Sequence, residues 1–173
     1  MEFYVPDIYK KSVYDIDYKK LKNNGIKCIL FDLDNTLIEY KQKEPSKEAL
    51  DLINRLKDLG FKVIIYSNGL TKRVKSFGEA FGIECYAFCK KPQDKKLRNL
   101  LKELRYNESE VAIIGDQILR DIILGNIVGI TTILTTPISK KEFIFTKLNR
   151  RSENKLIKKL SKLDLFYRGK YYE

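Results

Sequence analysis

Four short polar segments carry the side chains of this 173-residue chain that are best suited to chemistry. They are Asp32-Leu33-Asp34-Asn35-Thr36, Ser67-Asn68-Gly69, Lys90-Lys91-Pro92 and Gly115-Asp116-Gln117, the last followed by Asp121. Carboxylates can hold Mg²⁺, which prefers oxygen ligands, while ammonium and hydroxyl donors neutralise charge on a phosphate. One carboxylate is then free to attack phosphorus and form an aspartyl-phosphate. The set therefore favours phosphoryl transfer.

Three of the segments follow an apolar run as long as a buried strand. The fourth, Lys90-Lys91-Pro92, follows a shorter run. Helical spacing of leucine, isoleucine, valine and phenylalanine fills the intervals, and Gly60 and Gly82 mark helix ends. The alternation predicts a doubly wound α/β domain with a mostly parallel sheet. The predicted strands are Cys28–Phe31, Val63–Tyr66, the short segment Glu84–Phe88, Val111–Ile114 and Thr131–Leu134, and the predicted helices lie between them, with a terminal helix over Asn149–Lys162.

The carboxyl ends of parallel strands meet at one edge of a sheet, where ligands bind. We therefore expect the four polar segments to converge there. Asp32 and Asp34 are one residue apart, so an extended backbone would direct them to opposite faces. A turn at the strand end would let both reach the same substrate.

Taken singly, these residues have ordinary alternatives. As a calcium loop counted from Asp32, the chain has Leu37 where an EF-hand needs glycine and Lys43 where it needs glutamate. Ser67 alone is typical of a turn or cap, and Lys91 alone of a solvated charge. Their joint placement at strand ends favours a site.

Composition excludes several mechanisms. The chain has no histidine, which removes Ser/His triads, histidine-ligated zinc and histidine pH switches. Its three cysteines, Cys28, Cys85 and Cys89, contain no CxxC pair, so we expect them to fill apolar space in a reducing cytoplasm. The 34 basic and 23 acidic residues give a formal net charge of +11.

No long apolar segment is present in the sequence. The longest uninterrupted run, Cys85–Cys89, is far shorter than the roughly 20 residues of a membrane-spanning helix. Residues 1–20 lack the continuous apolar stretch of a signal peptide. We expect one domain over 1–173, with an N-terminal arm over 1–25 and a basic C-terminal helix over 147–165.

The four segments resemble the motifs of the haloacid dehalogenase (HAD) superfamily of phosphatases in order and spacing over residues 28–121. Within that superfamily the chain is similar almost end to end to the YqeG-type subclass IIIA phosphatases. Further landmarks are Pro6-Asp7, Ser12 to Ile16, Tyr66-Ser67-Asn68, Lys91-Pro92 and Lys147 to Arg151. The resemblance implies a HAD-like (Rossmannoid) three-layer domain.

For catalysis, the resemblance implies that Asp32 is the nucleophile and that Asp34 is the general acid, which later deprotonates water. Mg²⁺ would be coordinated by the side chains of Asp32 and Asp116 and by the main-chain carbonyl of Asp34. Asp121 would be a further ligand or would hold one of the ligands in place. Arg120 stands where many relatives have threonine. That departure puts the fine positioning of Asp121 in question.

For phosphate binding, the resemblance implies contacts from Ser67 and the amide of Asn68. Thr36 would stabilise the loop that follows the first strand. Lys91 would offset the charge that develops on the phosphoryl group, with Lys90 as the adjacent alternative.

Only 32 residues separate Asp34 from Ser67, and 23 separate Ser67 from Lys91, so no cap domain fits. An open site suits a phosphate on something large: a protein, a nucleic acid or a lipid head group. The subfamily resembles mitochondrial phosphatidylglycerophosphatases, which makes phosphatidylglycerophosphate the favoured substrate. The basic helix could lie on an anionic membrane, as a peripheral protein does, or pack its apolar face on the sheet.

Two other functions remain open at this stage. The excess of lysine also suits a protein that docks on RNA through a HAD scaffold, although no known RNA-binding motif is present. A phosphotransferase or mutase is less favoured, because nothing would exclude water from the aspartyl-phosphate. The sequence does not indicate an oligomeric state.

Overall fold

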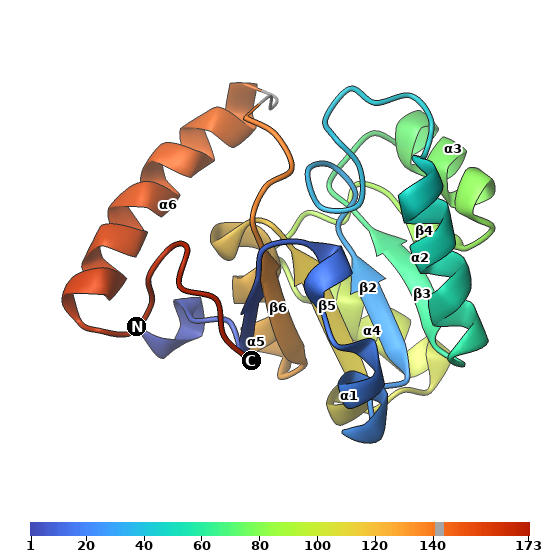
Figure 1. Cartoon of the computed structure of the whole chain (residues 1–173), viewed down its shortest axis with the longest axis horizontal. Coiled ribbons are helices and arrows are strands. Elements are labelled where there is room, and N and C mark those ends of the chain that lie inside the picture. The colour runs from blue at the N-terminus through green and yellow to red at the C-terminus, as the bar shows by residue number, and fades with distance from the viewer. Residues whose placement is uncertain (141–143) are drawn as a thin grey trace.

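The computed structural model describes residues 1–140 and 144–173, with only the backbone of residue 145. Its centre is a six-stranded parallel sheet with strand order β1-β6-β5-β2-β3-β4 (Figure 1). The strands are β1 (Ile8–Lys10), β2 (Cys28–Phe31), β3 (Lys62–Tyr66), β4 (Glu84–Tyr86), β5 (Val111–Gly115) and β6 (Thr131–Thr135). The sheet confirms the predicted α/β fold.

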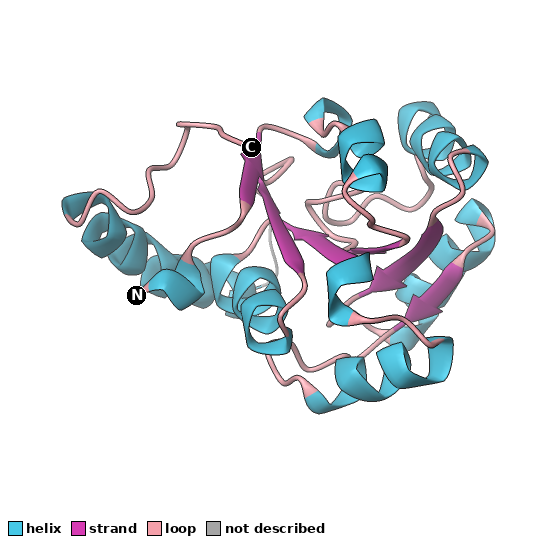
Figure 2. Ribbon diagram, turned by 90° about the horizontal axis from the view of Figure 1, so that it is seen from below, coloured by secondary structure: helices cyan, strands magenta, loops and turns pink. Residues whose placement is uncertain are grey.

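Helices cover both faces of the sheet, which gives three layers (Figure 2). They are α1 (Tyr18–Asn23), α2 (Lys47–Asp58), α3 (Thr71–Phe81), α4 (Lys95–Leu104) and α5 (Ile123–Val128), while α6 (Ile144–Lys162) lies to one side of the sheet (Figure 1). Because side chains alternate along a strand, Ile29 and Phe31 pack against α1, α2 and α3, while Cys28 and Leu30 pack against α4 and α5. Both faces of β2 are therefore buried, which explains its continuous apolar sequence.

The N-terminal segment predicted as an arm contributes an element of the sheet. Residues Ile8–Lys10 form β1, which pairs with β6 at the edge. The C-terminal tail covers part of the outer side of β1 through an antiparallel bridge between Tyr9 and Tyr172. A strand of three residues is too short to show periodicity, and its partner lies far away in the chain.

The C-terminal helix begins earlier than either predicted range, and it ends at Lys162 as predicted for Asn149–Lys162, not at residue 165. Helix α6 runs over Ile144–Lys162 rather than 147–165, and Asp164 has the left-handed φ of 57° that turns the chain back. Ile157 and Leu160 are buried in a cluster with Phe166. The second half of α6 therefore packs its apolar face on the core, as one of the two predicted alternatives requires.

The segments between the polar motifs are fully described and short. Residues 35–66 form a loop, α2 and β3, and residues 68–90 form α3 and β4, so neither interval holds an additional domain. Among the described residues, no helix combines the length and hydrophobicity needed to cross a bilayer.

Candidate active site

The three central strands end at the same level. Phe31 of β2 lies beside Ile65 of β3 and Ile114 of β5, so the residues that follow emerge at one edge. A cleft of about 570 Å³ opens there. Its lining includes residues of all four polar segments: Asp32, Asp34, Ser67, Asn68, Lys90, Lys91, Asp116 and Gln117.

Three carboxylates form a buried group beside this cleft. Asp32, Asp116 and Asp121 each offer an oxygen within 4.8 Å of the others, and Asp121 is fully buried. Burial and the neighbouring carboxylates raise the pKa of Asp116 to about 7 and that of Asp121 to about 6. Burial is the larger cause of both raised values, and the crowding of negative charge adds to it.

Lys91 lies between two of these carboxylates. Its Nζ donates to Asp32 Oδ1 at 2.7 Å and to Asp121 Oδ1 at 2.6 Å. Burial disfavours the ammonium, yet the carboxylates of Asp121 and Asp32 outweigh it and raise the pKa of Lys91. Lys90, the sequence alternative, is exposed on the cleft wall.

The approach of Asp121 depends on Gly115. A Cβ at position 115 would lie 2.1 Å from Asp121 Cγ, so glycine alone fits. A π-helical turn over Ile118–Ile122 directs Asp121 back to the end of β5, where its Oδ2 accepts from Gln117 N at 3.2 Å. Gly115 and the π-helical turn thus bring the carboxylate of Asp121 close to that of Asp116.

The chain turns immediately after β2, as the Asp32 and Asp34 pair required. Asn35 has a left-handed φ of 61°, and its N donates to Ile38 O at 2.6 Å. The carboxylate of Asp34 therefore lines the same cleft as Asp32, although it is not part of the group of three. Thr36 Oγ1 donates to Asp116 Oδ1 at 3.1 Å, which connects the first and last polar segments.

Arg73 of α3 binds Asp34 and was not predicted as a site residue. Its Nε and Nη2 donate to Asp34 Oδ1 at 3.0 and 2.7 Å, and its Nη1 donates to Gln42 O. Burial raises the pKa of Asp34, and the guanidinium opposes this rise. No motif marks Arg73, because the contact spans 39 residues and depends on the packing of α3.

The segment after β3 holds Lys91 in place. Asn68 Oδ1 accepts from Lys91 N at 2.7 Å, and Asn68 Nδ2 donates to Lys91 O at 3.2 Å. Ser67 Oγ accepts from Gly69 N at 3.0 Å, which is the turn expected of serine, and Ser67 also lines the cleft.

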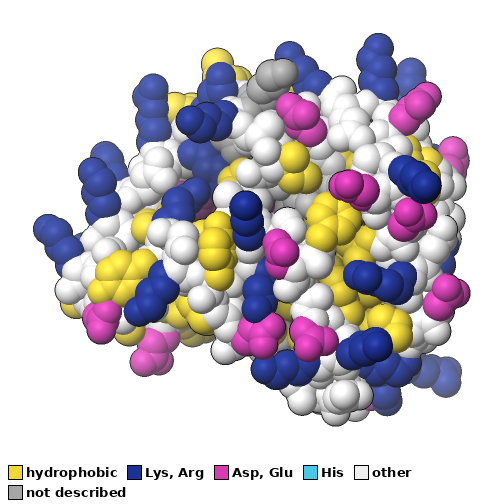
Figure 3. Space-filling model, viewed as in Figure 1, with side chains coloured by type: hydrophobic (Ala, Val, Ile, Leu, Met, Phe, Trp, Pro, Cys, Tyr) yellow, Lys and Arg dark blue, Asp and Glu magenta, His cyan; other side chains and the backbone are white. Residues whose placement is uncertain are grey.

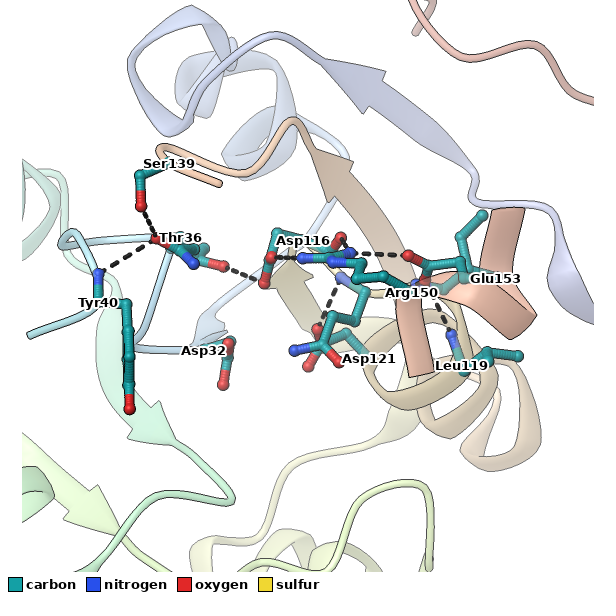
Figure 4. Close-up of polar contacts among 12 residues, drawn as sticks. Asp32, Thr36, Tyr40, Asp116, Leu119, Asp121, Ser139, Arg150 and Glu153 are labelled. Atoms are coloured by element: carbon teal, nitrogen blue, oxygen red, sulfur yellow. Dashed lines mark hydrogen bonds and ion pairs between the residues drawn. The ribbon is translucent and has the colours of Figure 1, made fainter. Parts of the chain in front are cut away.

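Helix α6 reaches the site through Arg150 (Figure 4). The Arg150 guanidinium contacts Asp116 Oδ2, and its Nη1 donates to Asp116 O and Glu153 Oε2, both at 2.7 Å. Glu153 Oε1 in turn accepts from the main-chain N of Ile118 and, at 3.3 Å, from that of Leu119. Glu153 is the one acid in a basic helix and lies three residues after Arg150, which is the signal in the sequence that could have identified the pair.

Arg150→Met is expected to destabilise the metal-free protein by about 3 kcal/mol, because it leaves the buried carboxylates of Asp116 and Glu153 without a cation that they share. Arg151→Met is the matched control: Arg151 is exposed, and its loss should change stability by less than about 0.5 kcal/mol. Urea unfolding in EDTA measures both. Equal stability of the two variants would show that the contact contributes nothing.

The donor set fits a divalent cation. Three buried carboxylates face two cationic side chains, Lys91 and Arg150, and the carboxylate oxygens that crowd together are the ligands Mg²⁺ prefers. A bound cation would relieve the repulsion between carboxylates that adds to the effect of burial on the pKa values of Asp116 and Asp121.

Comparison with known proteins identifies the family to which this chain belongs. The family model described as mitochondrial PGP phosphatase matches residues 1–139. The probable phosphatase YqeG of Bacillus subtilis is 32% identical over 161 residues, which cover 93% of this chain and 94% of that protein. Phosphatidylglycerophosphate phosphatase 1, chloroplastic/mitochondrial, of Arabidopsis thaliana is 30% identical over 169 residues, which cover 91% of this chain but 48% of that protein.

A solved structure supports the fold. A predicted HAD-like family hydrolase from Porphyromonas gingivalis matches with a TM-score of 0.54 at 15% identity, covering 73% of this chain and 98% of the other. At that identity the match shows the architecture alone. The family model and the relative of equal length go further: this chain is a HAD-type phosphatase and belongs to the mitochondrial PGP phosphatase family.

Proposed function

We propose that this phosphatase is Mg²⁺-dependent and hydrolyses phosphatidylglycerophosphate through an aspartyl-phosphate on Asp32. One observation carries the catalytic part of the proposal: Asp32 Oδ1 lies 2.7 Å from the buried ammonium of Lys91, within a group of carboxylates at the end of a cleft. A carboxylate so placed has both a cation to orient it and access to a substrate.

In the proposed first step, a carboxylate oxygen of Asp32 attacks phosphorus and the bond to the ester oxygen breaks. Asp34 gives its proton to the departing alcohol. In the second step Asp34 takes a proton from water, whose oxygen attacks the aspartyl-phosphate, so that inorganic phosphate leaves and Asp32 is restored. Burial raises the pKa of Asp34 against the opposing effect of the Arg73 guanidinium, which is the direction that a general acid needs.

The other residues bind and position. The side chains of Asp32, Asp116 and Asp121 and the main-chain carbonyl of Asp34 would hold Mg²⁺. When bound, the cation neutralises charge on the transferred phosphoryl group. Lys91 supplies a further positive charge, and Ser67 and the main-chain amide of Asn68 bind phosphate oxygens.

Thr36 and Arg150 have supporting roles in this proposal. Both contact Asp116, from the loop after β2 and from α6, and so fix its carboxylate from two directions. Partners of this kind orient a metal ligand without touching the metal.

The lipid substrate is supported by the described function of the family and of the Arabidopsis relative. The shape of the site agrees with it, because the intervals after β2 and β3 hold no inserted domain that could enclose the cleft. A phosphate at a membrane surface can enter such a cleft while the acyl chains stay in the bilayer.

The substrate assignment predicts that kcat/KM for phosphatidylglycerophosphate in mixed vesicles exceeds that for soluble glycerol 3-phosphate by at least about 100-fold, because binding of the rest of the lipid contributes to the transition state. Phosphate release from both, and from a panel of nucleotides and sugar phosphates, measures this, with EDTA as the blank. Faster turnover of a soluble nucleotide or sugar phosphate would overturn the lipid assignment and leave the reaction class intact.

A further inference from the structure

Apolar side chains that are exposed to solvent border the mouth of the active-site cleft. Leu70 is 67% exposed and Phe88 is 52% exposed, and both line the cleft. Ile138, Ile144 and Leu148 are also exposed, at 49%, 66% and 53%. These five residues are called the apolar rim below.

The apolar rim is assembled from four distant segments. Phe88 N donates to Gly69 O at 3.2 Å, which joins the segments of Phe88 and Leu70. Ile138 N donates to Asn35 O at 3.0 Å, which places Ile138 on the loop that follows β2. Thr146 of α6 lines the cleft, so the first turns of α6 lie beside its mouth, and Ile144 and Leu148, which share the opposite face of that helix, project outward into solvent there.

Phe88 is exposed and has a backbone conformation that bulky residues disfavour. Phe88 has a φ of 47° and Lys90 a φ of 56°, in the left-handed region that bulky residues disfavour. Between them, Cys89 N donates to Ser67 O at 3.1 Å, which anchors the segment to the site. Strain of this kind persists where the surrounding structure imposes it, and such positions cluster at functional sites.

Positive charge surrounds the apolar rim. Lys72, Lys90, Lys140 and Lys147 are exposed next to its members, and within the described part of the chain none of the four forms an ion pair. In Figure 3 lysine and arginine side chains project along α6 and the upper edge of the molecule, where the loops that follow the strands lie. The rim therefore combines apolar tips with lysines that form no ion pair among the described residues.

We propose that the apolar rim docks on an anionic lipid bilayer, with the cleft open toward the head groups. This inference rests on the proposed function, since a phosphate carried by a lipid lies at that surface. Apolar tips that enter the acyl boundary and lysines that contact anionic head groups are the two components of interfacial binding. Four of the five rim residues are aliphatic, which suits hydrocarbon, whereas single-stranded RNA would be held by aromatic platforms.

Co-sedimentation with vesicles tests the surface without any substrate. The probes are vesicles of phosphatidylglycerol and phosphatidylcholine, and vesicles of phosphatidylcholine alone. The rim variant is Ile144→Glu/Leu148→Glu. The matched control is Ile127→Glu/Leu163→Glu, which makes the same change at two exposed apolar residues outside the rim. A second rim pair, Ile144→Ser/Leu148→Ser, removes the apolar contact without adding charge.

Wild type and control should bind the anionic vesicles, and both rim variants should bind at least tenfold more weakly. All should hydrolyse a soluble aryl phosphate equally, because neither Ile144 nor Leu148 lines the cleft. Equal vesicle binding by all variants would overturn the inference, as would single-stranded RNA binding that the rim variants lose while no protein binds vesicles. Since these vesicles contain no phosphate monoester, rim-dependent binding without turnover of phosphatidylglycerophosphate would contradict the proposed substrate and not the surface.

Discussion

Asp32→Asn is expected to reduce phosphate release by at least about 10⁴-fold at saturating substrate while the protein stays folded, since the loss of a nucleophile removes the covalent route. The amide has nearly the same shape as the carboxylate but lacks the charge that attacks phosphorus. It also relieves repulsion, because the Asp32 carboxylate contributes to the raised pKa of both Asp116 and Asp121. Thermal unfolding should therefore show stability equal to or above that of wild type.

Asp51→Asn, at an exposed position on α2, is the control and should keep full activity and stability. Turnover by Asp32→Asn within tenfold of wild type would remove Asp32 from the role of nucleophile.

Lys91→Met is expected to have the second largest effect, with a loss of activity on the order of 10²–10³-fold, typical of removing one charge-stabilising donor. It also leaves the buried carboxylates of Asp32 and Asp121 without their common partner, which should cost about 3–5 kcal/mol of stability near neutral pH. Lys90→Met is the adjacent control on the cleft wall. A larger loss of activity in Lys90→Met would transfer the role to Lys90.

The stability loss of Lys91→Met should grow with pH. The Lys91 ammonium lowers the pKa of Asp121, so its removal raises that pKa further above the ordinary value for aspartate. When the pKa of a carboxyl group is higher in the folded than in the unfolded protein, the folded protein becomes less stable as the pH rises above the pKa of the unfolded state. Urea unfolding from about pH 4 to pH 8 should therefore show a widening gap between Lys91→Met and wild type.

The sequence predicted best those features that depend on a single element of secondary structure. Strands β2, β3 and β5 are buried on both faces, so they appear as continuous apolar runs, and their polar ends mark the edge of the sheet. The presence of glycine at position 115 and aspartate at position 121 reflects a local steric requirement, because a Cβ at position 115 would overlap the Asp121 side chain. Signals of this kind can be read without knowledge of the rest of the fold.

What could not be predicted depends on how distant elements pack. Arg150 contacts Asp116 across 34 residues, and Arg73 contacts Asp34 across 39, so neither pair follows from local periodicity. The apolar rim is hidden for the same reason, since Leu148 appears in sequence as an ordinary member of a helical segment and Leu70 as the residue before one. Their exposure depends on how α3 and α6 pack against the rest of the fold.

The central claim is that Asp32 carries the phosphoryl group during turnover, and chemical trapping tests it most directly. The reaction with Mg²⁺ and substrate is quenched, the acyl phosphate is reduced with borohydride, and the peptide that contains residue 32 is analysed by mass spectrometry. We predict conversion of Asp32 to homoserine in the complete reaction and none when EDTA replaces Mg²⁺. A phosphoryl group found on Ser67 or any other side chain, with Asp32 unmodified, would contradict the account.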